Sequence, residues 1–199
     1  RDAGIVGMGG ASFPTHVKLN VAPDKHIEAA LLNAAECEPY LTIDERTLQE
    51  DSKKVVDGFS IVMNIVGAKG IIVLEENKAF IKPLLQKEID AANLSSKMSV
   101  AIVKTKYPQG GERSLIYATT GRKINSSMLP ADVGCIVNNV DTIVAVERAV
   151  LEGKPLMERI VTVTGDAIKD PGNYKVPTGM SYTEVLEAAG GFAKEPEKI

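Results

Sequence analysis

The sequence predicts an α/β fold in which a parallel sheet is followed by a small α+β module. Two observations predict the sheet: short apolar runs alternate with amphipathic helical segments, and polar or glycine-rich loops follow the runs at their carboxyl ends. A third observation predicts the module, because the alternation stops after Pro155 and two short strands then precede one helix. We therefore divide the 199 residues into a first domain over 1–155 and a second over 156–199.

The first domain opens with a strand predicted at 27–33, where the apolar run IEAALLN ends at the polar loop AAECEPY. A helix is predicted over 44–66, because apolar residues recur there at spacings near three and four until Gly67 ends the pattern. The next predicted elements are a strand at 70–74, a helix over 78–92 with Pro83 near its start, and a strand at 99–103. Such a βαβαβ order closes right-handed into a parallel sheet, since only that crossover packs the helices back onto the twisted strands.

Four further predicted segments complete the first domain: the loop KTKYPQGG at 104–111, a helix over 112–119, a strand at 134–137 and a helix over 141–151. In the second module we predict strands at 159–164 and 174–176 on either side of a turn at 170–173. A capping-box sequence at 181–184 then opens a helix. Two strands and one helix cannot close a core, so we expect the sequence to stop inside this module.

The composition argues against several classes of function. Lysine and arginine number 23 against 26 acids, for a net charge of −3 without a basic block, which disfavours nucleic-acid binding. The longest apolar stretch, 58–74, is interrupted before it reaches the roughly 20 residues of a membrane span, and we expect no signal peptide in residues 1–20. Cys37 and Cys135 are too few for a disulfide framework or an iron–sulfur site, which favours a reducing, cytoplasmic setting.

Candidate ligand-binding residues follow the strands, because ligands of parallel sheets bind beyond the carboxyl ends of the strands. They are Asn33, Glu36, Cys37, Glu38 and Tyr40 after the first strand, Glu75 and Glu76 after the second, Tyr107, Gln109, Gly110, Gly111 and Glu112 after the third, and Asn138 and Asn139 after the fourth. Loops are polar in any fold, and for Glu75 and Glu76 we favour that simpler interpretation. The Gly110–Gly111 pair is more specific, because two glycines at a helix start let a ligand approach free backbone N–H groups.

The glycine-dense amino terminus, with Gly7, Gly9 and Gly10, lacks the GxGxxG dinucleotide pattern. Its glycines, with Lys18 one turn into the following helix, suit an anion such as phosphate, although a tight turn that caps this helix explains them equally well. His16 and His26 lie outside any metal-ligand spacing, so we expect no metal site. The sequence contains no nucleophile-elbow motif, so hydrolysis has no support. The carboxylates on both sides of Cys37 disfavour a reactive thiolate there. Cys135 lies in an apolar run and is predicted to belong to the core.

Five ordered motifs, which together extend over essentially the whole chain, resemble the C subunit of the Rnf ion-translocating electron-transport complex. They are GMGGASFPTHVKL at 7–19, NAAECEP at 33–39, KYPQGGE at 106–112, LPADVGCIVNNVDT at 129–142 and ERIVTVTGDAIKDPGNY at 158–174. The chain is also similar to the Rnf-C-like electron carrier of proline reductase and, more distantly, to the NADH-binding flavoprotein subunit of respiratory complex I. It departs from the complex I pattern at Met8, His16 and Ala35.

The resemblance implies a Rossmann-like domain that binds FMN and NADH, followed by a partial β-grasp domain of the soluble-ligand-binding (SLBB) type. It implies an NADH dehydrogenase-type oxidoreductase that passes hydride from NADH to FMN, and then electrons to 4Fe-4S clusters in a C-terminal part outside this sequence. The fragment is therefore not expected to complete turnover alone. Implied partners are other subunits of a membrane electron-transport complex, with the protein peripheral at the inner face of the cell membrane and not inserted into it.

The resemblance also implies roles for particular residues, while the flavin carries the chemistry and no side chain is catalytic. The flavin phosphate and ribityl chain would contact Gly7, Gly9, Gly10 and Lys18. The rest of the flavin pocket would be lined by Asn33, Glu36, Tyr107, Gly110, Gly111, Asn138 and Asn139. Glu38 and Glu112 would face NADH, with Phe13 stacking on its adenine. Two alternatives stay open: a carrier that supplies an amino-acid (proline) reductase, and a non-catalytic ligand-binding or scaffolding β-grasp module.

Overall fold

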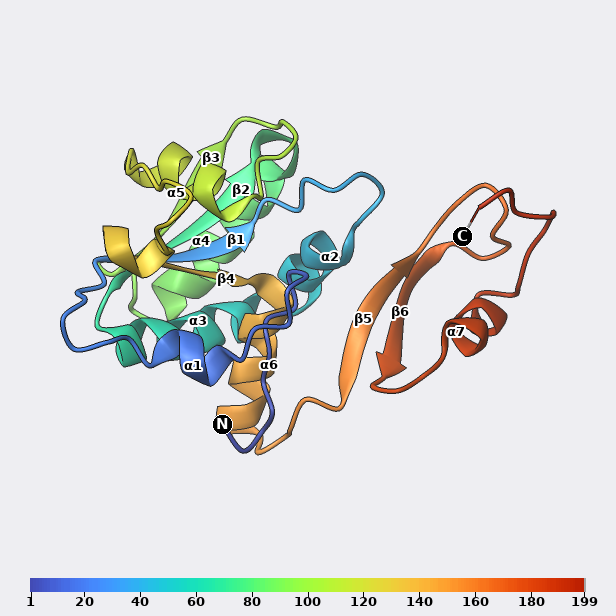
Figure 1. Ribbon diagram of the computed structural model, residues 1–199, viewed down its shortest axis with the longest axis horizontal. Coiled ribbons are helices and arrows are strands. Elements are labelled where there is room, and N and C mark those ends of the chain that lie inside the picture. The colour runs from blue at the N-terminus through green and yellow to red at the C-terminus, as the bar shows by residue number, and fades with distance from the viewer. Residues whose placement is uncertain (199) are drawn as a thin grey trace.

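A computed structural model of the protein describes residues 1–198 and shows a larger α/β domain beside a smaller β-hairpin module (Figure 1). The α/β domain contains four strands, β1 (Ala29–Ala34), β2 (Lys69–Glu75), β3 (Met98–Val103) and β4 (Cys135–Asn139). Their order in the sheet is β3-β2-β1-β4, and each neighbouring pair is parallel. The predicted parallel sheet is therefore confirmed.

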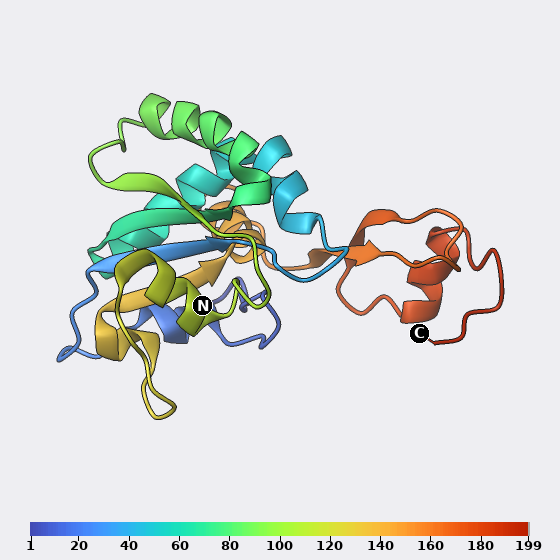
Figure 2. The ribbon, with the colours of Figure 1, turned by 90° about the horizontal axis from the view of Figure 1, so that it is seen from above.

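Helices cover both faces of the sheet, and Figure 2 shows α4 (Lys82–Ala91) and α5 (Glu112–Thr120) on opposite sides of it. Successive side chains of β1 point to opposite faces, so Leu31 and Leu32 belong to different apolar clusters. Leu32 joins the cluster that contains Phe59 of α3 (Ser52–Val66) and Ile143 of α6 (Val140–Leu151). Leu31 joins the cluster that contains Leu115 of α5. Cys135 is fully buried in this second cluster, as predicted.

Two helices differ from the prediction. The single helix expected over 44–66 is two helices, α2 (Ile43–Glu50) and α3. The helix is interrupted at Asp51, whose backbone is not helical; this residue terminates α2 and precedes the first residue of α3. The helix expected from residue 78 starts as the 3-10 helix η1 (Glu76–Ile81), and α4 begins only at Lys82. Pro83 explains this, since proline lacks an N–H donor and is tolerated only in the first turn of an α-helix.

Two short elements complete the α/β domain. Helix α1 (Thr15–Leu19) follows Pro14, and the 3-10 helix η2 (Pro130–Val133) leads into β4. Among residues 1–198, no helix has both the length and the hydrophobicity that crossing a membrane requires.

The second module consists of β5 (Glu158–Val163) and β6 (Gly172–Pro177), which pair antiparallel, and α7 (Tyr182–Ala188). The predicted capping box at Ser181 and Glu184 is confirmed. The predicted turn at 170–173 is wrong: the chain turns at Gly165–Ile168, where the Ile168 N–H donates to the Gly165 carbonyl, and Gly172 already pairs in β6.

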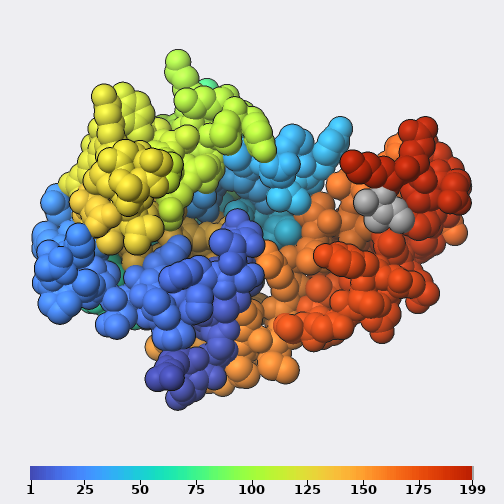
Figure 3. Space-filling model, in the orientation of Figure 1, coloured from blue at the N-terminus to red at the C-terminus, as the bar shows by residue number. Residues whose placement is uncertain are grey.

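The hairpin and α7 do not close a core within the described residues. A cavity of about 910 Å³ lies among apolar side chains that include Val161, Val176, Val185 and Phe192. No residue of α7 itself is buried. Figure 3 shows this module at one end of the molecule, beside the α/β domain.

Candidate functional site

The carboxyl edge of the sheet brings together residues from three separate parts of the sequence. Asn33 at the end of β1 lies opposite Asn139 of β4 in the parallel register. The Asn33 side-chain amide donates to the Gly110 carbonyl at 2.8 Å, which ties the loop after β3 to β1. Residues about 30 to 140 along the chain therefore lie together at this edge, as strand order predicts.

A buried ion pair organises the loop after β1. Glu36 and Lys78 have only 3% and 6% of their side chains exposed, and the Lys78 ammonium lies 3.0 Å from the Glu36 carboxylate. Lys78 also donates to the carbonyls of Ala35 and Glu36, both at 3.1 Å. These bonds hold Glu36 at a φ of +45°, a left-handed conformation that non-glycine residues seldom adopt.

The Glu36 carboxylate is also the anion at the start of α2. It accepts the backbone N–H groups of Asp44 at 2.7 Å and Glu45 at 3.2 Å. A carboxylate is favourable there because the first N–H groups of a helix have no partner within the helix. Glu36 therefore joins β1, α2 and η1.

Asp44 and Asn139 extend this network to β4. The Asn139 amide donates to both Asp44 carboxylate oxygens, at 3.2 and 3.0 Å, and its own oxygen accepts the N–H of Asp141 at the start of α6. Burial raises the pKa of Asp44 well above its usual value, and the charges of Glu36 and Asp141 act in the same direction. Burial also raises the pKa of Asp141.

The glycine loop, residues 7–10, lies against the start of α6. The Met8 N–H donates to the Thr142 hydroxyl at 2.9 Å. A side chain at Gly9 would come within 3.4 Å of Asn139 Cβ, and Gly10 has a φ of +126°, which favours glycine. The Lys18 ammonium donates to the Val137 carbonyl at 2.9 Å, so it lies near β4 with two further donors.

The loop before α5 approaches β1 closely. The Gly110 N–H donates to Cys37 Sγ at 3.2 Å, and a Cβ at Gly110 would lie 3.3 Å from the same sulfur. Gly111 is the residue that caps α5, as predicted. The charge of Glu38 raises the pKa of the Tyr107 hydroxyl.

The residues predicted to face NADH are exposed. Glu38 and Glu112 lie on the surface, and Phe13 is 47% exposed. The Phe13 carbonyl accepts the Gly7 N–H at 2.8 Å, which places Phe13 beside the glycine loop.

Three buried polar atoms around this edge have no hydrogen-bond partner among the described residues. They are Glu75 Oε1 at the end of β2, Gln109 Oε1 in the loop after β3, and Asn138 Nδ2 in β4. Each of these residues is at most 3% exposed. Burial raises the pKa of Glu75, so it is not the ordinary solvated loop residue that the sequence favoured, whereas Glu76 is exposed. Unpaired buried polar groups are costly, and a polar ligand at this edge would satisfy them.

Sequence reasoning missed two residues of this network, Lys78 and Asp44. Lys78 lies in η1, where an amphipathic pattern favours a solvated lysine, and Asp44 begins a helix, where an acid is ordinary. An available signal was the position of each residue: Lys78 lies in the helix that directly follows β2, and Asp44 lies in the first turn of the helix that follows the loop after β1.

The fold is an α/β domain, with buried unpaired polar atoms at the carboxyl edge of its sheet, joined to a hairpin–helix module. The chain belongs to the family of the Nuo51 FMN-binding domain, whose model matches residues 1–148, and an SLBB domain model matches residues 160–198.

The chain is similar to the C subunits of several ion-translocating complexes, which confirms the resemblance to the Rnf C subunit. It is 46% identical to the C subunit of the proton-translocating ferredoxin:NAD(+) oxidoreductase complex of Clostridium ljungdahlii, over 100% of this chain and 43% of that protein. It is 44% identical to the C subunit of the Na(+)-translocating ferredoxin:NAD(+) oxidoreductase complex of Acetobacterium woodii, over 100% of this chain and 44% of that protein. The chain thus spans less than half the length of these relatives.

Among solved structures, the chain is similar to an NAD+-reducing NiFe hydrogenase in the air-oxidized state. The TM-score is 0.82 and the identity 28%, over 94% of this chain and 37% of that chain. The Rossmann-like sheet followed by a partial SLBB-type module is therefore confirmed as the fold class.

Proposed function

We propose that this chain is the NADH-oxidising flavin module of an ion-translocating electron-transfer complex. It binds FMN at the carboxyl edge of the sheet and accepts hydride from NADH, and the electrons then pass to 4Fe-4S clusters in the rest of the full-length protein. The observation that carries the proposal is the set of unpaired buried polar atoms of Glu75, Gln109 and Asn138 at that edge, in a chain of an FMN-binding family.

The residues at the edge fit FMN. The N–H groups of Gly9 and Gly10 have no partner among the described residues and suit a phosphate, whereas the Gly7 N–H donates to the Phe13 carbonyl and shapes the loop. We assign Gly7 and Lys18 to the same end of the site, with Lys18 supplying a positive charge near β4. The rest of the pocket is assigned to polar or glycine residues of β1, β4 and the loop before α5: Asn33, Glu36, Tyr107, Gly110, Gly111, Asn138 and Asn139. Bound FMN would supply the conversion between two-electron and one-electron transfer.

The protein's own contribution is to bind and orient. The Glu36–Lys78 pair fixes the loop after β1, and the Asn33 bond to Gly110 fixes the loop before α5. These contacts fix the two loops before a cofactor binds. The entropy cost of ordering the loops on binding is therefore lower. We assign NADH to the exposed side of the same edge, where Glu38, Glu112 and Phe13 lie.

The relatives are subunits of ion-translocating complexes, and this similarity supports our proposal for the binding partners. We propose that the full-length protein binds other subunits of such a complex and lies peripherally at the inner face of the cell membrane.

An absorption spectrum with and without NADH tests the function. The protein, reconstituted with FMN, should show flavin absorbance that NADH bleaches without any other donor. Flavin binding without bleaching would instead support a carrier that receives electrons from a partner, as in an amino-acid reductase system. Failure to bind FMN would favour a ligand-binding or scaffolding module.

Replacing Glu112 should separate NADH binding from flavin binding. The variant Glu112→Ala loses a charged acceptor for a ribose or carboxamide group, and we expect about a tenfold rise in the NADH concentration needed for half-reduction. Flavin content, measured by absorbance after reconstitution, should stay unchanged. Glu187→Ala, which removes an exposed acid from α7, is the matched control. Loss of flavin in Glu112→Ala would instead place this residue against the flavin.

A further inference from the structure

The second module contacts the glycine loop of the first domain directly. Arg159 of β5 donates a guanidinium N–H to the Met8 carbonyl, across 151 residues of sequence. Met8 is held from the other side as well, because its N–H donates to the Thr142 hydroxyl of α6. Both polar groups of the Met8 backbone are therefore fixed by side chains from other elements.

This contact fixes the orientation of a glycine peptide. A trans peptide bond is planar, with its C=O and N–H groups pointing in opposite directions. When Arg159 holds the Met8 carbonyl, the Gly9 N–H must point away from Arg159. Gly9 and Gly10 have little conformational preference of their own, so without such a bond this peptide could rotate at small cost.

We propose that Arg159 is a positioning residue for the phosphate end of the flavin site, acting through the Met8–Gly9 peptide. The inference rests on the proposed function, in which the glycine loop binds the FMN phosphate. It gives the hairpin module a part in cofactor binding, although that module contributes no residue to the pocket assigned above.

A second contact of the same kind supports this role. Asn173 of β6 donates to the Thr42 hydroxyl at 3.0 Å and to the Thr42 carbonyl at 3.3 Å. Thr42 is the residue that begins α2, whose first N–H groups bind Glu36. Strand β5 thus contacts the glycine loop, and strand β6 contacts the residue before α2.

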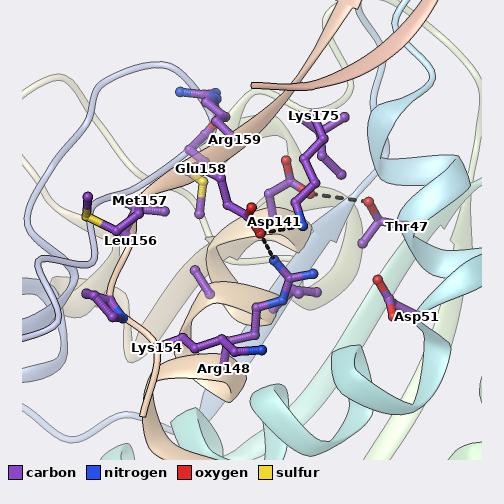
Figure 4. A pocket seen from close by; sticks show the side chains of 15 residues that line it. Thr47, Asp51, Asp141, Arg148, Lys154, Leu156, Met157, Glu158, Arg159 and Lys175 are labelled. Atoms are coloured by element: carbon purple, nitrogen blue, oxygen red, sulfur yellow. Dashed lines mark hydrogen bonds and ion pairs between the residues drawn. The ribbon is translucent and has the colours of Figure 1, made fainter. Parts of the chain in front are cut away.

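Arg159 lines a cavity of about 360 Å³ between the two parts of the molecule (Figure 4). The same cavity contains Arg148 and Lys175, which both pair with Glu158, at 2.8 and 2.5 Å. Because Arg159 is exposed beside an open space, its removal leaves no new void in a packed core, and variants at this position should fold.

The test compares Arg159→Met with Lys175→Met in the full chain of 199 residues. Both substitutions keep an unbranched side chain and remove one positive charge from the same cavity, but only the first removes the bond to Met8. Affinity for FMN and for riboflavin, which lacks the phosphate, is measured by quenching of flavin fluorescence. Thermal unfolding checks that each variant is folded, and Arg159→Ala, whose side chain also lacks an N–H donor, replaces the methionine variant if that one does not fold.

We expect Arg159→Met to weaken FMN binding about tenfold relative to Lys175→Met, while riboflavin affinity changes less than about twofold. Equal FMN affinity in the two variants would overturn the inference, and so would an equal loss for FMN and riboflavin. If the unsubstituted protein binds neither flavin, the proposed function itself fails, so the two failures are distinguishable.

Discussion

The variant Gly110→Val should abolish FMN binding. A Cβ at this position would lie 3.3 Å from Cys37 Sγ, 3.6 Å from Asn33 Oδ1 and 3.7 Å from Ala35 Cβ, so the two valine methyl groups have no room without moving the loop from β1. Displacement would also break the bond from Asn33 to the Gly110 carbonyl. We expect FMN affinity to fall more than about a hundredfold, or roughly 2.8 kcal/mol, as measured by fluorescence titration.

Gly172→Val is the matched control for this variant. Gly172 lies in β6, where a Cβ would meet only the Tyr174 ring at 3.8 Å, and valine is well suited to a strand. This control should bind FMN as the unsubstituted protein does. If Gly110→Val retained the same affinity as the control, FMN would bind elsewhere on the protein.

The variant Lys78→Met should strongly destabilise the protein. It removes the partner of the buried Glu36 carboxylate and the donor to two loop carbonyls. Removing one member of a buried ion pair leaves an uncompensated charge and costs about 3–5 kcal/mol. We expect a loss near the lower end of that range, about 3 kcal/mol, because the Asp44 and Glu45 N–H groups still bind Glu36. Urea unfolding monitored by circular dichroism measures this loss.

Lys87→Met is the control for the loss of a lysine from the same helical region, since Lys87 is exposed in α4. Surface substitutions of this kind change stability by less than about 0.5 kcal/mol. A similar stability for Lys78→Met and Lys87→Met would show that the Glu36–Lys78 pair does not hold the loop after β1.

Much of the fold follows from local patterns in the sequence. Apolar runs placed all four parallel strands to within two residues, since a strand buried on both faces must be apolar throughout. The end of α3 at Gly67 and the start of α7 at Ser181 and Glu184 were also predicted correctly. These helix caps depend only on residues close together in the sequence, so the sequence is enough to locate them. The break at Asp51 was missed because the apolar spacing continues across it.

The edge to which we assign the site also follows from strand order, because the carboxyl ends of parallel strands lie at the same edge of the sheet. Asn33, Asn139 and Gly110 were expected there from strand order; Asn33 lies opposite Asn139 in the register, and its amide donates to the Gly110 carbonyl. Their assignment to flavin, and that of Phe13, Glu38 and Glu112 to NADH, remains a prediction, as does the boundary between residues 155 and 156.

By itself, therefore, the sequence determined the order of strands along the chain, the edge of the sheet and the glycines that line it. Only the tertiary structure decided that Lys78 is buried against Glu36, that Glu75 Oε1 lacks a hydrogen-bond partner among the described residues, and that Arg159 binds the Met8 carbonyl. The first and third of these properties depend on contacts between residues 42 and 151 positions apart in the sequence. Local periodicity cannot encode them, because burial and pairing of a charged group are set by neighbours that only the folded chain brings into contact.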